Sequence, residues 1–407
     1  MARILVVGGS LGGLFVANLL ARDGHEVVVL EKAAGSLDGR GAGIVTHAAL
    51  LDGLRRAGTT VDDTLGVAVE TRVSLDVDGR TAVRRPFPQI LTSWSRLYAM
   101  LYDAFPHASY RHGVSVARVE QDAQGARAIA DDGTRFDGDL LVASDGIRSV
   151  VRQQLLPDAS PRYAGYVAWR GVCDESVLSS HTLSTVFDCF GFGLPTGEQL
   201  IGYPVAGHGN DTRRGRRRWN FVWYRAADEA VGLRALMTDA DGTHYPLGIP
   251  PNKVSWKHVA AMREAARRLL APQFAEILEK TAQPFLQPIY DVASSRLAFD
   301  RIALMGDAAF VARPHVGMGV TKAAEDATAL CDAIRTHGAT PAALRAFEDA
   351  RLSAGHAVVE HARRLGAYLE RHASNPIARD DDDVVRHTAV GLGRVPDPPA
   401  VDRQRAA

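Results

Sequence analysis

The chain has 407 residues, of which 46% are hydrophobic, and its 47 basic side chains balance 47 acidic ones. This hydrophobic content excludes a wholly disordered chain, and the length suits two or three domains or one large composite domain. A net charge of zero provides no overall field for a nucleic acid or an anionic membrane, so neither partner is expected. Three widely spaced cysteines show no disulfide or zinc-ligand pattern, which predicts a cytoplasmic protein without a metal site: Cys173, Cys189 and Cys331.

The first thirty residues predict a β-α-β unit. Residues 3–8 are expected to form a buried strand, residues 10–23 a helix, and residues 25–31 a second buried strand. Such units build parallel sheets. The uncharged run between Arg3 and Arg22 resembles an export signal or a membrane helix, but four glycines interrupt it. No other run approaches the roughly 20 apolar residues that a membrane-spanning helix needs.

The central part of the chain alternates between helical and strand-like patterns. Up to residue 143 we expect a loop and helix over 32–60, strands over 67–83, an amphipathic helix over 92–105, and a three-strand meander over 114–143 that ends in an apolar strand. From about 160 to 290, short aromatic stretches predict a mostly antiparallel sheet, with helices near 258–282. The strands expected in that sheet cover residues 163–170, 185–193, 199–204 and 218–224.

Near residue 295 the chain returns to the pattern of its beginning. A buried strand is expected over 301–305, and helices over 318–336 and 341–373. The residues after 375 contain four consecutive aspartates and several prolines, which predict an irregular, solvated tail.

A glycine-rich turn follows the first strand, in the run Gly8-Gly9-Ser10-Leu11-Gly12-Gly13. Glycines at such a turn let the backbone approach a pyrophosphate, and the helix N-terminus provides free N–H groups and a partial positive charge. Glu31, followed by Lys32, ends the second strand 23 residues after Gly8, where a carboxylate can accept hydrogen bonds from a ribose. The turn therefore predicts a dinucleotide site that includes Gly8, Ser10, Leu11, Gly13, Glu31 and Lys32.

These patterns predict an α/β fold, in which a Rossmann-like domain carries an inserted, mostly antiparallel sheet domain and C-terminal helices. The cleft between the two domains is the expected ligand site. We assign residues 1–70, 92–160 and 291–374 to the dinucleotide-binding domain, residues 71–91 and 161–290 to the substrate domain, and residues 375–407 to the tail.

Two later motifs decide between NAD and FAD. One is the run from Ala143 to Arg152, which contains Asp145-Gly146, and the other is Gly306-Asp307-Ala308-Ala309 followed by residues 314–319. With these three motifs in order, the sequence over roughly residues 2–370 resembles the single-component FAD-dependent aromatic hydroxylases, the family of p-hydroxybenzoate hydroxylase. The resemblance implies a FAD-binding domain of the glutathione-reductase type.

The resemblance also implies how FAD is held. Asp307 would accept a hydrogen bond from the ribityl chain, and residues 317–320 would present helix N–H groups to the pyrimidine end of the flavin. The remaining FAD contacts implied by the family motifs are Arg40, Gly43, Ile44, Val45, Asp145, Gly146, Gly306, Pro314, Gly317, Met318, Gly319 and Val320. Relatives usually have an FAD-binding arginine where this chain has Trp94, and Arg96 is displaced from that place.

The reaction implied by the family joins FAD, a nicotinamide and dioxygen. NADH, or NADPH in its place, would reduce the flavin transiently, and oxygen would then add to form a flavin hydroperoxide that hydroxylates a ring carbon beside a ring hydroxyl. The blocks at 91–94, 163–171, 203–204, 220–224 and 313–315 are similar to family members that act on small hydroxylated N-heteroaromatic rings. Other aromatic rings, epoxidation of a natural product and a flavin-binding sensor without hydroxylase activity remain alternatives. A homodimer is expected.

A hydroxylated pyridine reacts better as an anion, so the site needs a group that accepts its proton. Histidine, with a pKa near 6.5, suits that task. The candidates are His47, just past the flavin loop, His315, beside Pro314, and His208, after a strand end. Tyr203 is a candidate hydrogen-bonding partner of the substrate, while Trp169 and Trp223 are expected in the core. The arginines of 213–218 are expected in a solvated hairpin turn.

Overall fold

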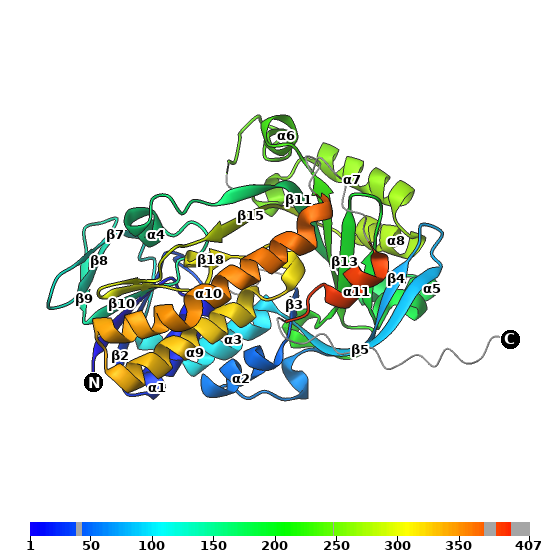
Figure 1. Ribbon diagram of the computed structural model, residues 1–407. Helices are drawn as coiled ribbons and strands as arrows, with labels where there is room; N and C mark the ends of the chain where they lie inside the picture. Colours follow the sequence, from blue (N-terminus) through cyan, green and yellow to red (C-terminus); the bar gives the residue numbers. More distant parts are fainter. Residues whose placement is uncertain (38–42, 247, 370–379, 392–407) are drawn as a thin grey trace.

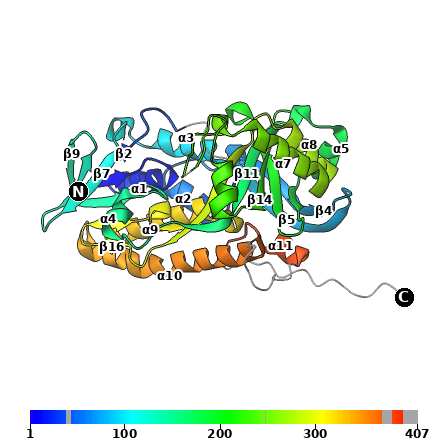
Figure 2. The ribbon, with the colours of Figure 1, turned by 90° about the horizontal axis from the view of Figure 1, so that it is seen from above.

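The computed structural model describes residues 1–37, 43–246, 248–369 and 380–391. Two large sheets lie end to end, and the N-terminal strands and the aromatic central strands occupy opposite ends of the molecule (Figures 1 and 2). The long helix α10 (Pro341–Gly366) contacts strands of both sheets along one side. The two sheets are therefore bridged by the C-terminal helical region.

The first sheet has six strands in the order β16-β17-β10-β1-β2-β6. Its strands are β1 (Arg3–Val7), β2 (Glu26–Glu31), β6 (Tyr110–His112), β10 (Leu140–Ala143), β16 (Ala298–Phe299) and β17 (Ile302–Leu304). All neighbours pair in parallel except β16 and β17. Its strands consist of nearly continuous runs of buried aliphatic residues, as expected for a parallel sheet that is covered on both faces. Helix α1 (Leu11–Arg22) packs against β1 and β2, and the small meander packs against β1 and β10.

Helices from distant parts of the chain pack around this sheet. They are α1 (Leu11–Arg22), α2 (Ala48–Arg56), α3 (Trp94–Ala104), α4 (Val150–Leu155) and α9 (Gly319–His337). Helix α1 packs against both α3 and α9. The predicted β-α-β unit and the predicted helices at 92–105 and 318–336 are confirmed.

The second sheet has nine strands in the order β18-β15-β11-β14-β13-β12-β4-β5-β3. Their bounds are β3 (Gly43–Val45), β4 (Val67–Leu75), β5 (Thr81–Ser93), β11 (Arg162–Asp174), β12 (Phe190–Gly193), β13 (Gln199–Val205), β14 (Arg218–Ala226), β15 (Phe285–Ala293) and β18 (Phe310–Val311). Helices α7 (Trp256–Leu269) and α8 (Pro272–Lys280) contribute side chains to the core on one face, which contains Trp169 and Trp223. The other face carries a separate core that includes Tyr166, Tyr203 and Tyr224.

Two smaller features differ from the sequence prediction. The meander consists of β7 (Val116–Gln121), β8 (Ala126–Ala130) and β9 (Arg135–Gly138), whereas the apolar strand that was expected to end it is β10 of the first sheet. The strand predicted over 185–193 begins only at Phe190. The residues before it form helical turns that include α5 (Ser180–Thr182), and α6 (Arg234–Leu236) is similarly short.

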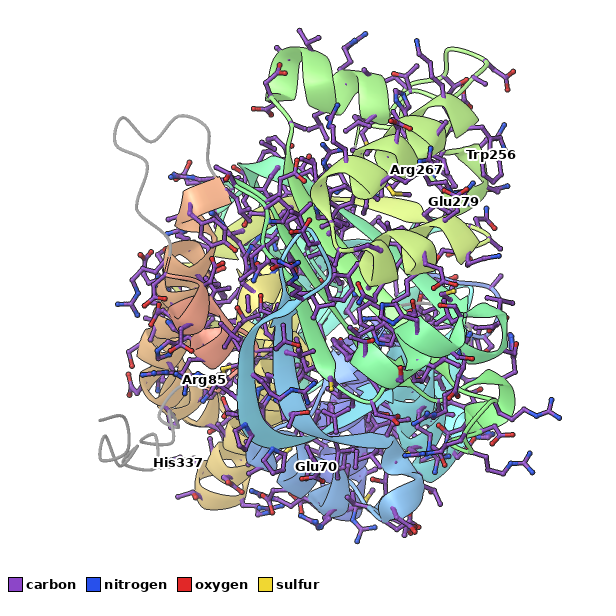
Figure 3. The ribbon with its side chains drawn as sticks, turned by 90° about the vertical axis from the view of Figure 1, so that its right-hand side faces the viewer. Glu70, Arg85, Trp256, Arg267, Glu279 and His337 are labelled. Carbon is purple, nitrogen blue, oxygen red and sulfur yellow. The ribbon has the colours of Figure 1, made fainter. Side chains whose placement is uncertain are left out.

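The prediction of an irregular C-terminal tail is wrong for residues 381–387. These residues form helix α11 (Asp381–His387), which buries Val384 and Val385 against the second sheet. The Asp380 side chain accepts a hydrogen bond from the Asp382 N–H, and three acidic residues occupy the first turn, where the helix dipole favours negative charge. The aspartates therefore begin a helix. Arg85 of β5 pairs with Asp382 beside it (Figure 3).

The arginine-rich turn before β14 is only partly solvated. Arg213 and Arg214 are exposed, but Arg217 is buried and pairs with Glu175 at 2.7 Å and with Asp188 at 2.8 Å. Within the described ranges, no helix has both the length and the apolar content needed to cross a membrane.

Candidate active site

The three dinucleotide motifs meet at one edge of the six-stranded sheet. In register, Val7 pairs with Ala143, and Ala143 pairs with Leu304. Because these strands are parallel, the residues that follow them emerge side by side. Gly8 has φ +96°, and a Cβ atom there would overlap the Ser144 carbonyl, so the close approach of these two segments requires glycine.

Glu31 connects the end of β2 to the glycine-rich turn. Its Oε2 accepts a hydrogen bond from the Gly9 N–H at 2.8 Å, and its Oε1 accepts one from the Ala33 N–H at 2.8 Å. Each carboxylate oxygen can accept a second hydrogen bond. The carboxylate is thus fixed by the backbone at the wall of a cavity.

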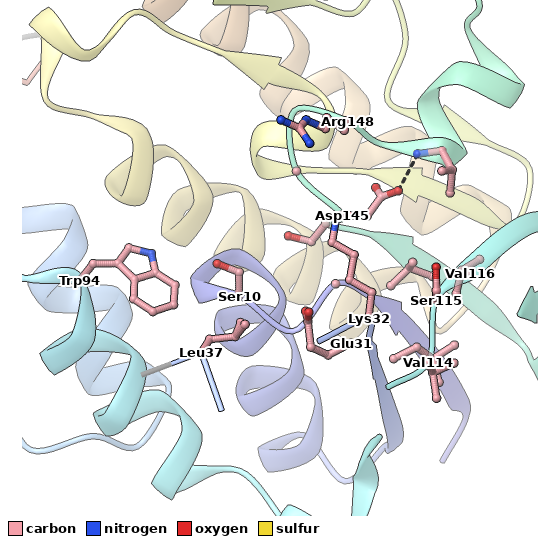
Figure 4. Close-up of a pocket in the computed structure, with 16 residues that line it drawn as sticks. Ser10, Glu31, Lys32, Leu37, Trp94, Val114, Ser115, Val116, Asp145 and Arg148 are labelled. Atoms are coloured by element: carbon pink, nitrogen blue, oxygen red, sulfur yellow. Dashed lines mark hydrogen bonds between the residues drawn. The ribbon is translucent and has the colours of Figure 1, made fainter. Parts of the chain in front are cut away.

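This cavity has a volume of about 340 Å³ (Figure 4). It is lined by Val7, Gly8, Ser10, Leu30, Glu31, Lys32, Leu37, Trp94, Val114, Ser115, Val116, Ser144, Asp145, Gly146, Arg148 and Val150. Six of the predicted FAD contacts are among these residues. Leu11 and Gly13 lie buried behind them in the first turn of α1.

Trp94 and Arg148 are two of the ten lining residues that were not predicted as FAD contacts. Trp94 stacks on Tyr98 of the same helix and presents its indole to the cavity from α3, while Arg148 approaches from the loop before α4. Trp94 packs against the core as well as lining the cavity. Arg96, which does not line the cavity, donates a hydrogen bond to Thr64 instead.

Asp145 and Arg152 tie the second motif to the third. Asp145 Oδ2 accepts a hydrogen bond from the Val150 N–H at 2.9 Å, and Oδ1 is buried without a hydrogen-bond partner in the described part of the chain. Burial raises the pKa of this carboxyl above its usual value. The fully buried Arg152 donates to the carbonyls of Ile147 and Ala308, which lie in different motifs.

Asp307 is exposed within a run of otherwise buried residues at the end of β17. The preceding Gly306 N–H donates to Asp326 Oδ2 of α9 at 3.1 Å, and Arg351 of α10 donates to Asp326 Oδ1 at 2.8 Å. This buried link fixes the turn that carries Asp307. Neither Asp326 nor Arg351 was predicted to have this role.

These residues fit FAD. Helices α1 and α9 both begin without a side-chain cap and without an acidic residue in the first turn, so their N–H groups and dipoles are available to an anion. A glycine cradle, a buried carboxylate and an exposed Asp307 surround the same edge of the sheet. The Pro314–Val316 turn and Gly317, Met318, Gly319 and Val320 lead into α9, as predicted. Arg40 lies outside the described residues.

The predicted flavin loop forms strand β3 and then reaches His47. At one end, the Gly43 N–H donates to Asn220 Oδ1 at 3.0 Å, and Tyr203 packs so closely that a Cβ on Gly43 would lie 2.5 Å from its ring. Asn220 is buried and pairs with Tyr203 in register, yet it was not predicted as a site residue. Burial raises the pKa of Tyr203 to about 12, so its phenol remains protonated at neutral pH and suits a hydrogen-bond donor.

At the other end, His47 lines a second cavity of about 730 Å³. The cavity is lined by Thr46, His47, Ala48, Ala49, Leu51, Ala68, Glu70, Phe87, Pro88, Gln89, Ile90, Met318, Thr321, Glu325, Ala389, Val390 and Gly391. His47 Nδ1 lies 2.9 Å from Thr321 Oγ1. Burial lowers the pKa of His47, the nearby Ala389 backbone partly opposes this, and Arg72 lowers the pKa further.

His315 occupies a different environment. It is fully buried and lines neither cavity. Its Nε2 accepts a hydrogen bond from the Tyr166 hydroxyl at 2.8 Å, and its Nδ1–H donates to Gln199 Oε1 at 2.8 Å. Burial lowers its pKa to about 3, so it remains neutral. This geometry does not fit the predicted catalytic base, because both ring nitrogens are already hydrogen-bonded within the core.

His208 also does not fit the predicted catalytic role. It is exposed in a short turn after β13 and lines neither cavity. Tyr224, by contrast, is fully buried in the same core as Tyr203, with its ring 4.2 Å from the His315 ring. His47 is thus the one predicted histidine that lines a described cavity.

The neutral state of His315 has a measurable consequence for stability. Its pKa falls from about 6.5 in the unfolded chain to about 3 in the folded protein. Above pH 6.5 His315 therefore leaves the free energy of unfolding undiminished, and as the pH falls from 6.5 toward 3 the preference of the unfolded chain for the proton lowers this free energy. Each pH unit in that window costs about 1.4 kcal/mol from this group. We expect His315→Gln to flatten the acid dependence of the free energy of unfolding, measured by urea denaturation between about pH 6 and pH 4. The exposed control His208→Gln should keep the wild-type slope, and an equally steep slope in His315→Gln would contradict the assignment.

Comparison with known proteins agrees with this geometry. A family model described as an FAD binding domain matches residues 1–180, and one described as FAD binding domain-like matches residues 163–291. A 2,6-dihydroxypyridine 3-monooxygenase from Paenarthrobacter nicotinovorans is 31% identical over 375 residues, which cover 91% of this chain and 92% of that protein. A 3-amino-4-hydroxybenzoate 2-monooxygenase from Streptomyces cremeus is 31% identical over 408 residues, covering 95% and 92% of the two chains.

The fold comparison extends over the whole chain. The solved structure of 2,6-dihydroxypyridine-3-hydroxylase from Arthrobacter nicotinovorans matches with a TM-score of 0.87 at 29% identity, covering 98% of this chain and 99% of that one. Sequence, fold and cofactor cradle therefore agree: the chain belongs to the family of single-component FAD-dependent aromatic monooxygenases.

Proposed function

We propose that this enzyme hydroxylates 2,6-dihydroxypyridine to 2,3,6-trihydroxypyridine, with NADH, or NADPH in its place, as the reductant. In the overall reaction, one oxygen atom of O₂ is inserted into a ring C–H bond. The other oxygen leaves as water, and the nicotinamide is oxidised. The observation that carries the proposal is the 730 Å³ cavity, which is lined both by His47, after the predicted flavin loop, and by Met318, in the turn that leads into α9.

The lining of this cavity favours a hydroxylated heteroaromatic ring over a benzoate. Among the described residues that line it, Glu70 and Glu325 are acidic, and none is lysine or arginine. A substrate carboxylate would therefore enter a cavity that offers no cationic partner, at a considerable desolvation cost. A neutral dihydroxypyridine carries no such charge on entry. The relatives that act on dihydroxypyridine support the same choice.

His47 supplies the base in this proposal. Bound FAD provides the oxygen chemistry, while the protein orients the ring, excludes water and removes its proton. Burial keeps the His47 imidazole neutral at neutral pH, and the contact with Thr321 fixes the ring. The nitrogen that does not face Thr321, Nε2, takes the proton of the substrate hydroxyl. Deprotonation makes the ring a better nucleophile.

A substrate panel tests the proposal directly. We expect NADH oxidation by the FAD-loaded enzyme to be stimulated by 2,6-dihydroxypyridine, with a product one oxygen atom heavier by mass spectrometry. Hydroxybenzoates should give at least tenfold lower kcat/KM, because the cavity lacks a cationic side chain. Equal turnover of hydroxybenzoates, or NADH oxidation without a heavier product, would contradict the proposed substrate.

Replacing His47 tests the base. We expect His47→Gln to lower kcat by about 100-fold, within the usual range for general-base catalysis. The wild-type rate should fall as the pH drops through the His47 pKa, which lies below its ordinary value, and this acidic limb should disappear in the variant. Steady-state kinetics across pH measure both effects. His208→Gln is the matched control and should keep the wild-type rate and profile, whereas an unchanged acidic limb in His47→Gln would exclude His47.

Glu31 is proposed to accept a hydrogen bond from the FAD ribose. Glu31→Gln removes the charge and one of its two acceptor oxygens, so we expect the Kd for FAD to rise about tenfold. Fluorescence titration of the apoprotein with FAD measures this. Glu26→Gln, at the exposed start of the same strand, should leave the Kd unchanged. An unaltered Kd in Glu31→Gln would remove this carboxylate from the FAD site.

A further inference from the structure

The short segment from Asp380 to Gly391 contacts several parts of the candidate site. After α11, Thr388, Ala389 and Val390 are all buried, although none lies in a helix or a strand. The segment crosses the second sheet beside β4 and β13, on the face that carries Tyr203 (Figure 1).

Arg72 of β4 is its main anchor. This side chain is fully buried, and no carboxylate of the described residues lies within ion-pair distance of it. Its guanidinium donates to the carbonyls of Val385 at 2.8 Å and Thr388 at 2.7 Å, and to Gln89 Oε1 at 2.7 Å. The guanidinium carbon also lies 4.0 Å from the centre of the Phe87 ring.

A buried cation without a carboxylate is costly unless other groups stabilise it. Burial lowers the pKa of Arg72 to about 9, so it still carries its charge at neutral pH. The carbonyl dipoles at the end of α11 supply the compensating interaction, since cations are favoured at the C-terminal end of a helix. The buried charge of Arg72 is therefore stabilised by the segment as long as the carbonyls of Val385 and Thr388 remain in contact with it.

The same segment is hydrogen-bonded to the Pro314–Val316 turn. The Ala389 N–H donates to the His315 carbonyl at 2.8 Å, and Gln199 bridges the His315 ring to the Thr388 hydroxyl, to which its Nε2 donates at 3.2 Å. Ala389 has φ +56°, a left-handed conformation that costs an alanine about 1 kcal/mol. The strained residue lies directly against Gly317: a Cβ atom added to Gly317 would lie 2.9 Å from the Ala389 Cβ.

The end of the segment lies against the candidate base. Ala389, Val390 and Gly391 line the 730 Å³ cavity, and a Cβ on Gly391 would lie 3.5 Å from His47 Cδ2. The Ala389 backbone also acts on the His47 ring. One side of the cavity is thus made by residues that the sequence assigned to an irregular tail.

We propose that Asp380–Gly391 forms a wall of the substrate cavity, that Arg72 is a positioning residue that holds this wall, and that Gly391 sets the size of ring admitted beside His47. The proposal rests on the proposed function, because it takes this cavity as the substrate site. Arg72 acts through the backbone of the segment and does not touch the substrate.

Hydrogen exchange tests the anchoring without any substrate. In FAD-loaded Arg72→Met, amides of residues 384–391 should exchange at least tenfold faster than in the wild type, and Arg72→Lys should restore part of the protection. Arg217→Met is the matched control, because it removes another buried arginine, which pairs with Glu175 and does not line the cavity. It should lower the melting temperature but leave exchange at 384–391 unchanged. Unchanged exchange in Arg72→Met would overturn the anchoring role.

Kinetics test the wall. With 2,6-dihydroxypyridine, Arg72→Met should raise KM about tenfold while the FAD Kd, measured by fluorescence, stays within twofold of the wild type. Arg217→Met should keep the wild-type KM. If Arg72→Met shifts KM no more than Arg217→Met, Arg72 has only a structural role and the positioning proposal fails.

Gly391→Val tests the size of the cavity while Arg72, the buried anchor of the segment, stays unchanged. It should raise KM for ring-substituted dihydroxypyridines at least tenfold more than for the parent ring. An equal change for all rings would overturn the role of Gly391. If the wild type turns over no hydroxypyridine, the proposed substrate fails, and the exchange experiment still decides the anchoring by Arg72 separately.

Discussion

The parallel register of β1, β10 and β17 is the constraint on which the cofactor site depends. These strands are separated by more than a hundred residues in the sequence, yet Val7, Ala143 and Leu304 lie side by side. Parallel pairing sends all three chains out at the same sheet edge. The turns that follow supply a glycine cradle, a buried carboxylate and an exposed one. Arg152, which bonds to carbonyls of two motifs, locks the second turn against the third.

A second set of buried polar contacts joins this edge to the aromatic sheet. Asn220 holds the start of the flavin loop, and His315 holds the turn at its other side through Tyr166 and Gln199. Buried polar groups of this kind are costly unless each finds a partner, and satisfied networks specify one arrangement. The predicted flavin loop is therefore held by the nine-stranded sheet, through Asn220, as well as lying beside the six-stranded sheet. In the stretch from Gly43 to His47, Gly43 thus lies against Tyr203 of β13, and His47 lies at the opposite end.

Local patterns were sufficient to predict most of the first sheet. The β-α-β unit and its glycine turn follow from strand-like and helical periodicity within thirty residues, and three motifs in order indicated the family. Other features depend on contacts between distant residues. Neither the burial of His315 nor the inward position of Asn220 is visible in sequence spacing, because each depends on which strands become neighbours. The four consecutive aspartates suggested a solvated, irregular segment, whereas they form the beginning of α11. The sequence signal for a packed helix was the apolar pair Val384-Val385 that follows them.

The residue at position 94 affects the chemistry of the cavity beside the glycine-rich turn. Trp94 stands where the family resemblance leads us to expect an arginine, and its indole forms a wall of the 340 Å³ cavity. An indole contributes contact area and a π face in place of a positive charge. We therefore propose that binding of the FAD pyrophosphate depends more on helix dipoles and on Arg148, which lines the same cavity.

The central claim is that one FAD binds where the three strand ends converge. Titration of the apoprotein with FAD, followed by flavin fluorescence and by visible absorbance of the desalted complex, tests it most directly. The account predicts one FAD per chain, with binding weakened in both Gly8→Ala and Asp307→Ala, which alter two different strand ends. A wild-type protein that stays colourless after titration, or variants that both bind FAD as tightly as the wild type, would contradict the account.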